Sequence, residues 1–97
     1  MLKETILGAA VNLARESSYR DISRRDVALA AECASGTVNY HFESMDLLRT
    51  AVVEYAVQHE IVEIVADALA NKHPTAIAAP EALRRRAARQ LSGVDRL

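Results

Sequence analysis

Aromatic residues, glycine and proline are scarce in this sequence. Only 4% of its 97 residues are aromatic and tryptophan is absent, with three glycines and two prolines, whereas 51% of the chain is apolar. This composition is typical of an alanine-rich helical protein and excludes a sheet protein or a disordered chain. We therefore predict an all-α fold, whose modest core needs good helix packing or a partner chain.

Cysteine and long apolar runs are also nearly missing. Cys33 is the only cysteine, which excludes an intrachain disulfide and a zinc framework. The histidines at 41, 59 and 73 are far apart and have no carboxylates at ligand spacing, so we expect no metal site, no cofactor, no catalytic set and no enzyme activity. The N-terminal residues alternate charge with apolar side chains, so we expect no signal peptide, no membrane span and a cytoplasmic protein.

A net charge of −1 hides a segregation of charge along the chain. Residues 51–78 carry one lysine against four acidic residues, one minus four or −3, and residues 79–97 carry five arginines against two acidic residues, five minus two or +3. Opposite charges in consecutive segments favour their lying side by side, either in one chain or across two chains.

Helical periodicity accounts for most of the sequence. Apolar residues recur every three or four positions near the N-terminus, and Ser23 followed by Asp26 is a weak capping box. Ser44 is placed to cap the helix that follows it. The helices we expect are Leu2–Glu16, Arg24–Ala31, Ser35–Phe42, one long uninterrupted helix Met45–Ala70, and Pro80–Leu91.

The second and third expected helices are joined by three or four residues, which is the spacing of a helix-turn-helix unit. The TetR family of bacterial transcriptional regulators has an N-terminal DNA-binding domain that resembles ILGAAVNLARESSYRDISRRDVALAAECASGTVNYHFESMDLLRTAV. The likeness is carried by IL-x-AA, by D-V-A followed by A-A, by G-T-V-N-Y-H-F and by S-x-D-L-L. The resemblance implies a three-helix DNA-binding domain over residues 1–50 and a helical dimerisation segment over residues 51–97.

The chain departs from the family pattern at three positions and in length. Glu32 stands where the family usually has glycine in the turn, and Ala34 stands where it usually has serine, so we expect the cap to move to Ser35. Met45 replaces a lysine that commonly meets DNA phosphate, which removes one backbone contact. Family members normally add a large ligand-binding and dimerising domain, of which only about one and a half helices remain, so we expect no small-molecule ligand.

The candidate DNA contacts lie on the second and third expected helices. Gly36 and Thr37 begin the third helix, where free N–H groups and the helix dipole favour a phosphate. The Asn39 amide can pair with adenine in the major groove, although it could also be simply solvated. Tyr40 and His41 resemble family positions that bond phosphates, with half-buried packing as the alternative for Tyr40. The complete set is Arg24, Arg25, Ser35, Gly36, Thr37, Asn39, Tyr40 and His41.

The two arginines of this set, Arg24 and Arg25, begin the second helix. In a helix-turn-helix docking they would lie beside the phosphate backbone and supply counterion release. A solvated charged face is the alternative. Phe42 is expected to fill the core between the first and fourth helices and not to contact DNA.

Apolar residues of the long expected helix form a seam at alternating steps of four and three. The N-terminal domain can cover only the first turns of this helix, so the remaining seam should pack against the last helix and a second subunit in a four-helix arrangement. The residues assigned to dimerisation are Tyr55, His59, Val62, Ala66 and Leu69.

These features together predict a homodimeric transcriptional regulator that binds a pseudo-palindromic site on double-stranded DNA and represses by blocking a promoter. Its regulation would come from its own concentration or from a protein partner. The alternative is an interaction protein, such as an antirepressor, that keeps the fold but binds another regulator. Glu32, Met45 and the slightly negative first fifty residues motivate this alternative.

Overall fold

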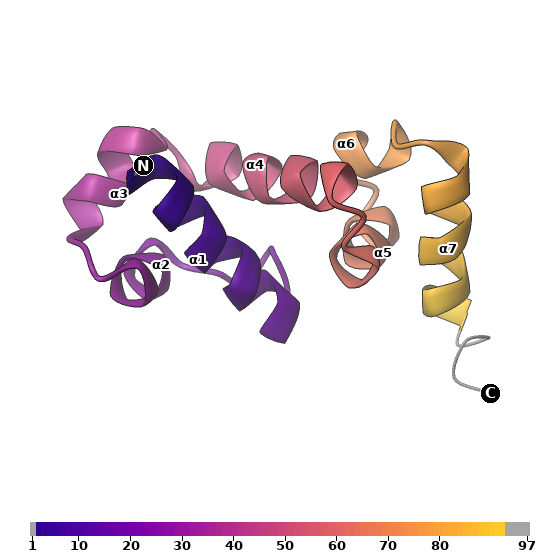
Figure 1. Cartoon of the computed structure of the whole chain (residues 1–97), viewed down its shortest axis with the longest axis horizontal. Helices are drawn as coiled ribbons and strands as arrows, with labels where there is room; N and C mark the ends of the chain where they lie inside the picture. Colours follow the sequence, from indigo (N-terminus) through magenta and orange to yellow (C-terminus); the bar gives the residue numbers. More distant parts are fainter. Residues whose placement is uncertain (1, 93–97) are drawn as a thin grey trace. The chain divides into compact units, whose positions relative to one another are not determined.

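The computed structural model describes residues 2–92, which form seven α-helices and no strand (Figure 1). The predicted all-α fold is therefore confirmed. No helix in this range is long and apolar enough to cross a membrane. The helices are α1 (Leu2–Glu16), α2 (Arg24–Ala31), α3 (Ser35–His41), α4 (Met45–Gln58), α5 (Val62–Ala70), α6 (Pro74–Ile77) and α7 (Glu81–Ser92).

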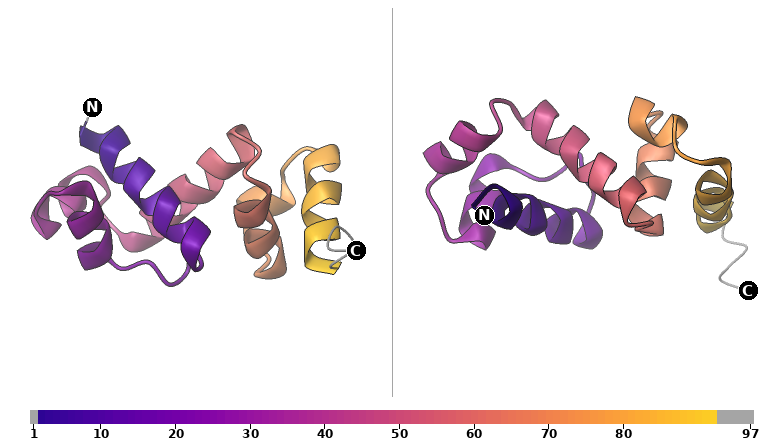
Figure 2. Two further views of the ribbon diagram at one scale, coloured as in Figure 1. Left: turned by 60° about the horizontal axis from the view of Figure 1, so that its bottom comes forward. Right: turned by 45° about the horizontal axis from the view of Figure 1, so that its top comes forward.

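The chain divides into two compact units, Met1–Val52 and Val53–Leu97, which we call the N-terminal and C-terminal units. In the N-terminal unit α1 packs against both α2 and α3, and α2 packs against α3 (Figure 2). Helical spacing of apolar residues explains these contacts, because each helix turns one apolar stripe toward the same core. The largest fully buried side chains of this core are Ile6, Val27, Val38, Leu48 and Val52.

Capping serines fix where two helices of the N-terminal unit begin. The Ser23 side chain accepts a hydrogen bond from the Asp26 N–H at 3.0 Å, and the Ser44 hydroxyl accepts one from the Leu47 N–H at 3.1 Å, as the sequence predicts. At α3 the expectation was wrong. Ala34, with extended backbone at φ −78° and ψ 152°, is the N-cap and offers no side-chain acceptor, while Ser35 is already the first helical residue.

The predicted single helix over residues 45–70 is wrong, because the chain turns between Gln58 and Val62. Glu60 adopts the left-handed conformation with φ 53°. The Ile61 N–H then bonds the Ala56 carbonyl at 2.8 Å, and the Glu60 N–H bonds the Val57 carbonyl at 3.4 Å. This pair of bonds is a Schellman ending, which terminates α4 without a glycine or proline.

The same ending recurs after α2 and α5. Glu32 and Lys72, each with φ 57°, are left-handed. The Cys33 N–H bonds the Ala28 carbonyl at 2.9 Å, and the His73 N–H bonds the Ala68 carbonyl at 2.9 Å. Glycine adopts this conformation without the Cβ clash, whereas an L-residue costs about 1–2 kcal/mol there. The helix-turn-helix turn is therefore built on a strained Glu32.

In the C-terminal unit α5 and α7 lie side by side, and the short α6 packs on α5 (Figure 2). The fully buried Ile64, Val65 and Ala87 belong to this packing, and an ion pair of 2.6 Å joins Arg86 Nη1 to Glu60 Oε1. The expected side-by-side arrangement of acidic and basic segments is thus confirmed within one chain. The helix α6 was not predicted.

Candidate nucleic-acid interface

Helix α3 separates two sets of side chains onto opposite faces. Val38 is fully buried and Phe42, which ends the helix, is 7% exposed. Gly36, Asn39 and Tyr40, at spacings of three and four residues, share the outward face and are exposed. The apolar pair anchors the helix on the core, so the polar face is presented to solvent on a fixed support.

The support beneath α3 includes a contact from the first helix. The Lys3 ammonium group lies 5.3 Å from the centroid of the Phe42 ring, a cation–π distance. The Phe42 N–H also bonds the Val38 carbonyl at 2.8 Å. The sequence prediction that Phe42 serves the core of the N-terminal unit agrees with its burial.

Tyr40 is a highly exposed aromatic side chain of the candidate surface, with 81% of its area accessible. Its ring meets the half-buried His41 ring edge-on, with 5.1 Å between centroids and an interplanar angle of 87°. The alternative of half-buried packing for Tyr40 is therefore wrong. The phenol is held by its neighbour and projects away from the protein.

Glycine at position 36 is not required by the protein itself. A Cβ atom built on Gly36 would meet nothing within 4 Å, and its φ lies outside the left-handed range. Glycine in a helix costs about 0.5–1 kcal/mol relative to alanine, so its presence here lowers stability without relieving a contact. Its neighbours Ser35 and Thr37 are exposed and half-buried, respectively. The first turn of α3 is thus open to close approach from outside.

The two candidate arginines at the start of α2 differ in access. Arg25 is exposed, whereas Arg24 is half-buried and its Nε is buried without a hydrogen-bond partner in the described part of the chain. The Arg24 stem therefore packs along the protein while its head can still reach solvent. Arg25 is therefore the more accessible of the two cations.

Arg49 is a residue of this region that sequence reasoning missed. Its Nη2 donates to the Ile22 carbonyl at 3.1 Å, and its Nη1 lies 3.6 Å from the Asp46 carboxylate. The bond to Ile22 holds α4 against the segment that leads into α2, next to the Ser23 cap, and the Asp46 pair lies within α4. No local pattern could have revealed a side chain that bonds a carbonyl 27 residues earlier.

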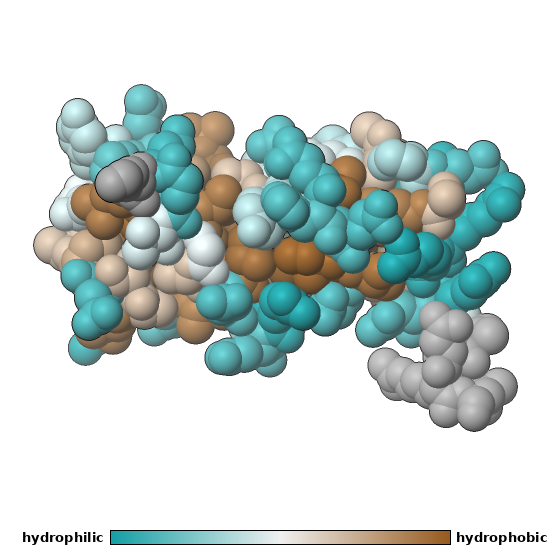
Figure 3. Space-filling model, in the orientation of Figure 1, coloured by the Kyte–Doolittle hydropathy of each residue, from teal (hydrophilic) through white to brown (hydrophobic). Residues whose placement is uncertain are grey.

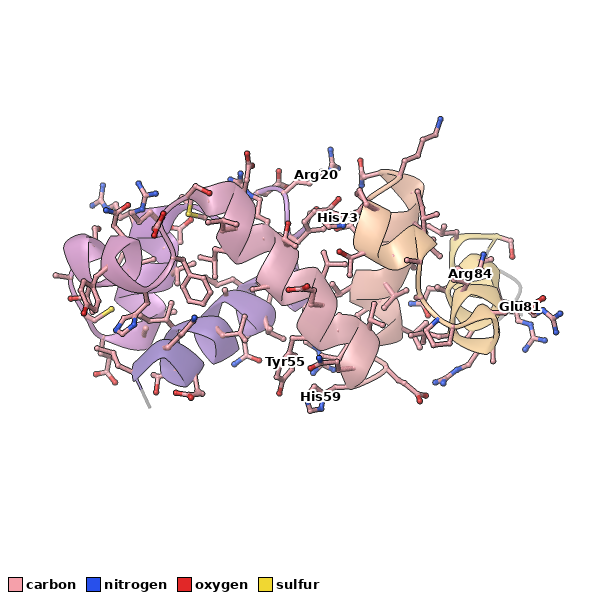
Figure 4. All side chains as sticks on the ribbon, turned by 90° about the horizontal axis from the view of Figure 1, so that it is seen from above. Arg20, Tyr55, His59, His73, Glu81 and Arg84 are labelled. Atoms are coloured by element: carbon pink, nitrogen blue, oxygen red, sulfur yellow. The ribbon has the colours of Figure 1, made fainter. Side chains whose placement is uncertain are left out.

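The residues predicted for dimerisation fall on both sides of the break after α4. Tyr55 and His59 stack with 4.1 Å between ring centroids at the end of α4 (Figure 4). Val62 and Leu69 are half-buried on α5, whereas Ala66 is only 3% exposed. The expected continuous seam on one helix is wrong because Glu60 interrupts it. Ala66 already packs within the chain.

Within residues 2–92 no three His, Cys, Asp or Glu side chains come close enough together to hold a metal ion. The candidate residues of α2 and α3 offer amide, hydroxyl, phenol, imidazole and guanidinium donors around an open glycine. Such donors suit hydrogen bonds to phosphate oxygens and base edges.

Comparison with known protein families gives a match over the N-terminal unit. Residues 6–52 match the family model described as bacterial regulatory proteins, tetR family. This range begins in α1 and ends in α4, and so includes the whole of α2 and α3. No curated protein and no solved structure matches the chain.

Proposed function

Because residues 6–52 place the chain in the TetR family of bacterial regulatory proteins, we propose that this DNA-binding regulator is a homodimeric repressor acting on a pseudo-palindromic operator. The observation that carries the proposal is the outward face of α3, where Gly36, Asn39 and Tyr40 are exposed above the buried Val38. A short helix with one polar face can enter the major groove, which is wide enough to admit a helix.

The proposed contacts divide by chemistry. Asn39 offers a carboxamide that can bond adenine N6 and N7 at the same time, so we assign base reading to it. The Tyr40 hydroxyl and the His41 ring offer single donors suited to phosphate oxygens, which position the duplex without reading sequence. Ser35 and Thr37 can add hydroxyl contacts at the same end of the helix, and Arg25 and Arg24 add charge.

Gly36 explains how the backbone of α3 can come close to DNA. Where a larger residue would hold the helix away, the missing Cβ leaves free space on the exposed surface. The stability cost of glycine in a helix is then offset only when the partner is bound.

Dimerisation is proposed to use the C-terminal unit. Tyr55, Val62 and Leu69 keep accessible apolar area, and Ile77 and Leu91 are 51% and 52% exposed. Apolar side chains also gather on the visible surface over α5 (Figure 3). A second copy would remove such area from water, and His59 beside Tyr55 would lie at the edge of this contact. Ala66 is already buried within its own chain, so it has little area to contribute to this contact.

A two-fold dimer presents two recognition helices to two half-sites, which explains the proposed symmetry of the operator. Repression would follow from occupying a promoter in the cytoplasm. Control would come from the concentration of the protein or from a regulatory protein partner, and a small-molecule ligand is not part of the proposal.

The second candidate function is an interaction protein that keeps the domain but binds another regulator. The net charge of the N-terminal unit favours this second function. The unit carries six cationic and seven acidic side chains, a net charge of six minus seven, or −1. DNA affinity rests largely on phosphate neutralisation, which such a balance supports weakly. A salt titration separates the two functions, because only the DNA-binding regulator loses affinity steeply as salt rises.

Two glycine substitutions test the main proposal. Gly36→Ala adds a methyl group on the outward face of α3, and Gly8→Ala adds one in α1, where a Cβ also meets nothing within 4 Å. Neither variant should be less stable than the parent, and the free energy of unfolding should rise by up to about 1 kcal/mol. Only Gly36→Ala should weaken DNA binding, by ~10-fold or more, equivalent to about 1.4 kcal/mol.

Fluorescence anisotropy with duplexes selected from genomic DNA measures this difference. A Gly36→Ala protein that binds as tightly as Gly8→Ala would show that α3 does not approach DNA closely. A parent protein with no preferred fragment and no salt dependence would favour the interaction protein instead.

A further inference from the structure

The last helix, α7, carries four arginines and a single acidic residue. Its buried stripe consists of Leu83 and Ala87. Helical geometry therefore places Arg85, Arg86 and Arg89 away from the core, and all three are exposed. Hydrophilic surface covers this helix in Figure 3. We call these three residues the arginine face.

The fourth arginine of the helix, Arg84, has a structural role and is not part of this face. Arg84 is half-buried, and its Nε donates to the Ala79 carbonyl at 2.9 Å. The bond closes the turn that leads into α7, and Figure 4 labels Arg84 on this helix. No comparable bond to a backbone carbonyl holds the arginine face within the part of the chain that the structure describes.

The ion pairs of the arginine face lie on the surface. Arg85 meets Glu81 at 2.6 Å, with the two side chains 70% and 66% exposed, and Arg86 meets Glu60 at 2.6 Å, with 51% and 62% exposed. Arg89 makes no ion pair within residues 2–92. Exposed pairs contribute little to stability and are screened by salt. Arg85 and Arg86 can therefore leave their carboxylate partners and bind another anion with little loss of protein stability.

The rest of the chain lacks a comparable concentration of positive charge. The N-terminal unit, which holds the candidate recognition helix, has the balance of −1 given above. Residues 82–92 contain four arginines and no acidic residue. A regulator that binds DNA at physiological salt needs several phosphate contacts. Among the described helices, α7 carries several exposed arginines that could make such contacts together.

We propose that the arginine face of α7 is a second, sequence-independent contact for the phosphate backbone of double-stranded DNA. Arginine suits this role because its planar guanidinium donates two hydrogen bonds to one phosphate and stays charged. The proposal rests on the proposed function, since it adds a contact at α7 to the phosphate contacts of α2 and α3 and leaves sequence reading to α3. Each phosphate neutralised contributes about 0.9 to the slope of log K against log salt.

The test compares the full-length parent with the triple variant Arg85→Gln, Arg86→Gln, Arg89→Gln. Glutamine keeps most of the aliphatic stem and a similar helix propensity, and it replaces the charged guanidinium with a neutral amide. Each protein is titrated at several salt concentrations with a random-sequence duplex longer than the operator, and with the duplex selected from genomic DNA. Circular dichroism and sedimentation confirm that the fold and the oligomeric state are unchanged.

We expect the triple variant to lower the salt slope by about 2 to 3 per subunit on both duplexes, with the ratio of selected to random affinity unchanged. A single-charge control is available in the same unit. Arg89→Gln should lower the slope by about 1, whereas Lys72→Gln, which removes an exposed cation outside α7, should leave it unchanged.

An unchanged slope in the triple variant overturns the α7 contact, and the proposed function stands if the parent still prefers its selected duplex. In that case the arginine face would have a partner of another class, such as an acidic protein surface. Another outcome is a parent that shows no sequence preference, while the triple variant still has a lower salt slope than the parent. That result supports the α7 contact and rejects the proposed repressor. A parent that binds neither duplex overturns both.

Discussion

The turn between α2 and α3 predicts that Glu32→Gly stabilises the protein. Glu32 holds φ 57°, a conformation that costs an L-residue about 1–2 kcal/mol and costs glycine nothing. Glycine in return loses about 0.5–1 kcal/mol more conformational entropy on folding. The difference is a gain of about 0.5–1 kcal/mol, because the exposed Glu32 side chain contributes no burial that the substitution would remove.

The gain is large enough to measure by urea unfolding and by thermal melting, each followed by circular dichroism. For a domain of this size 1 kcal/mol raises Tm by about 4–8 °C, so Glu32→Gly should melt about 2–8 °C higher than the parent. Glu32→Ala is the matched control, since it removes the same carboxylate but keeps an L-residue in the left-handed conformation. We expect the alanine variant to show no gain.

Equal stability of the glycine and alanine variants would refute this reasoning, because it would mean that the carboxylate and not the backbone sets the energy of the turn. Any change in DNA affinity caused by the lost negative charge should be the same in both variants. The backbone effect is therefore separated from the charge effect within one experiment.

Three further predictions concern the cap, the phosphate contacts and the dimer. Ala34→Ser supplies the missing acceptor at the start of α3 and should stabilise the protein by about 1 kcal/mol in urea unfolding. Tyr40→Phe and Arg25→Ala should weaken binding to every sequence in anisotropy titrations, and only the arginine change should lower the salt slope, by about 1. Val62→Asp should give a monomer by sedimentation, because it places an unpaired charge in the proposed contact. Val62 is the first residue of α5, where acidic residues are tolerated, so the variant chain should stay folded. A variant that is still a dimer would show that the interface does not include Val62.

Sequence reasoning located the helices of the N-terminal unit because their ends carry side-chain signals. Ser23 and Ser44 are acceptors at helix starts, and both are used. The break at Glu60 could not be predicted in this way. Its signal would have been a glycine, and the chain uses a glutamate whose strain is balanced by the Schellman bonds.

The candidate surface was predictable in part for a similar reason. The alternation of Val38 and Phe42 with Asn39 and Tyr40 follows from helical spacing, so the outward face of α3 could be assigned from the sequence. The difference in access between Arg24 and Arg25 and the support from Arg49 depend on packing between distant segments. Such contacts leave no periodic pattern in the sequence.

The most direct test of sequence-specific DNA recognition is the affinity ratio between a duplex selected from genomic DNA and a random duplex, measured for the parent and for Asn39→Ala. Asn39 is exposed on the outward face of α3 and makes no hydrogen bond to another side chain within residues 2–92. We predict that the ratio falls by ~10- to 100-fold, consistent with about 1–3 kcal/mol for a bidentate base contact, while affinity for random DNA is unchanged. An Asn39→Ala protein that loses affinity equally for both duplexes, or that keeps the parent ratio, would contradict base reading by α3.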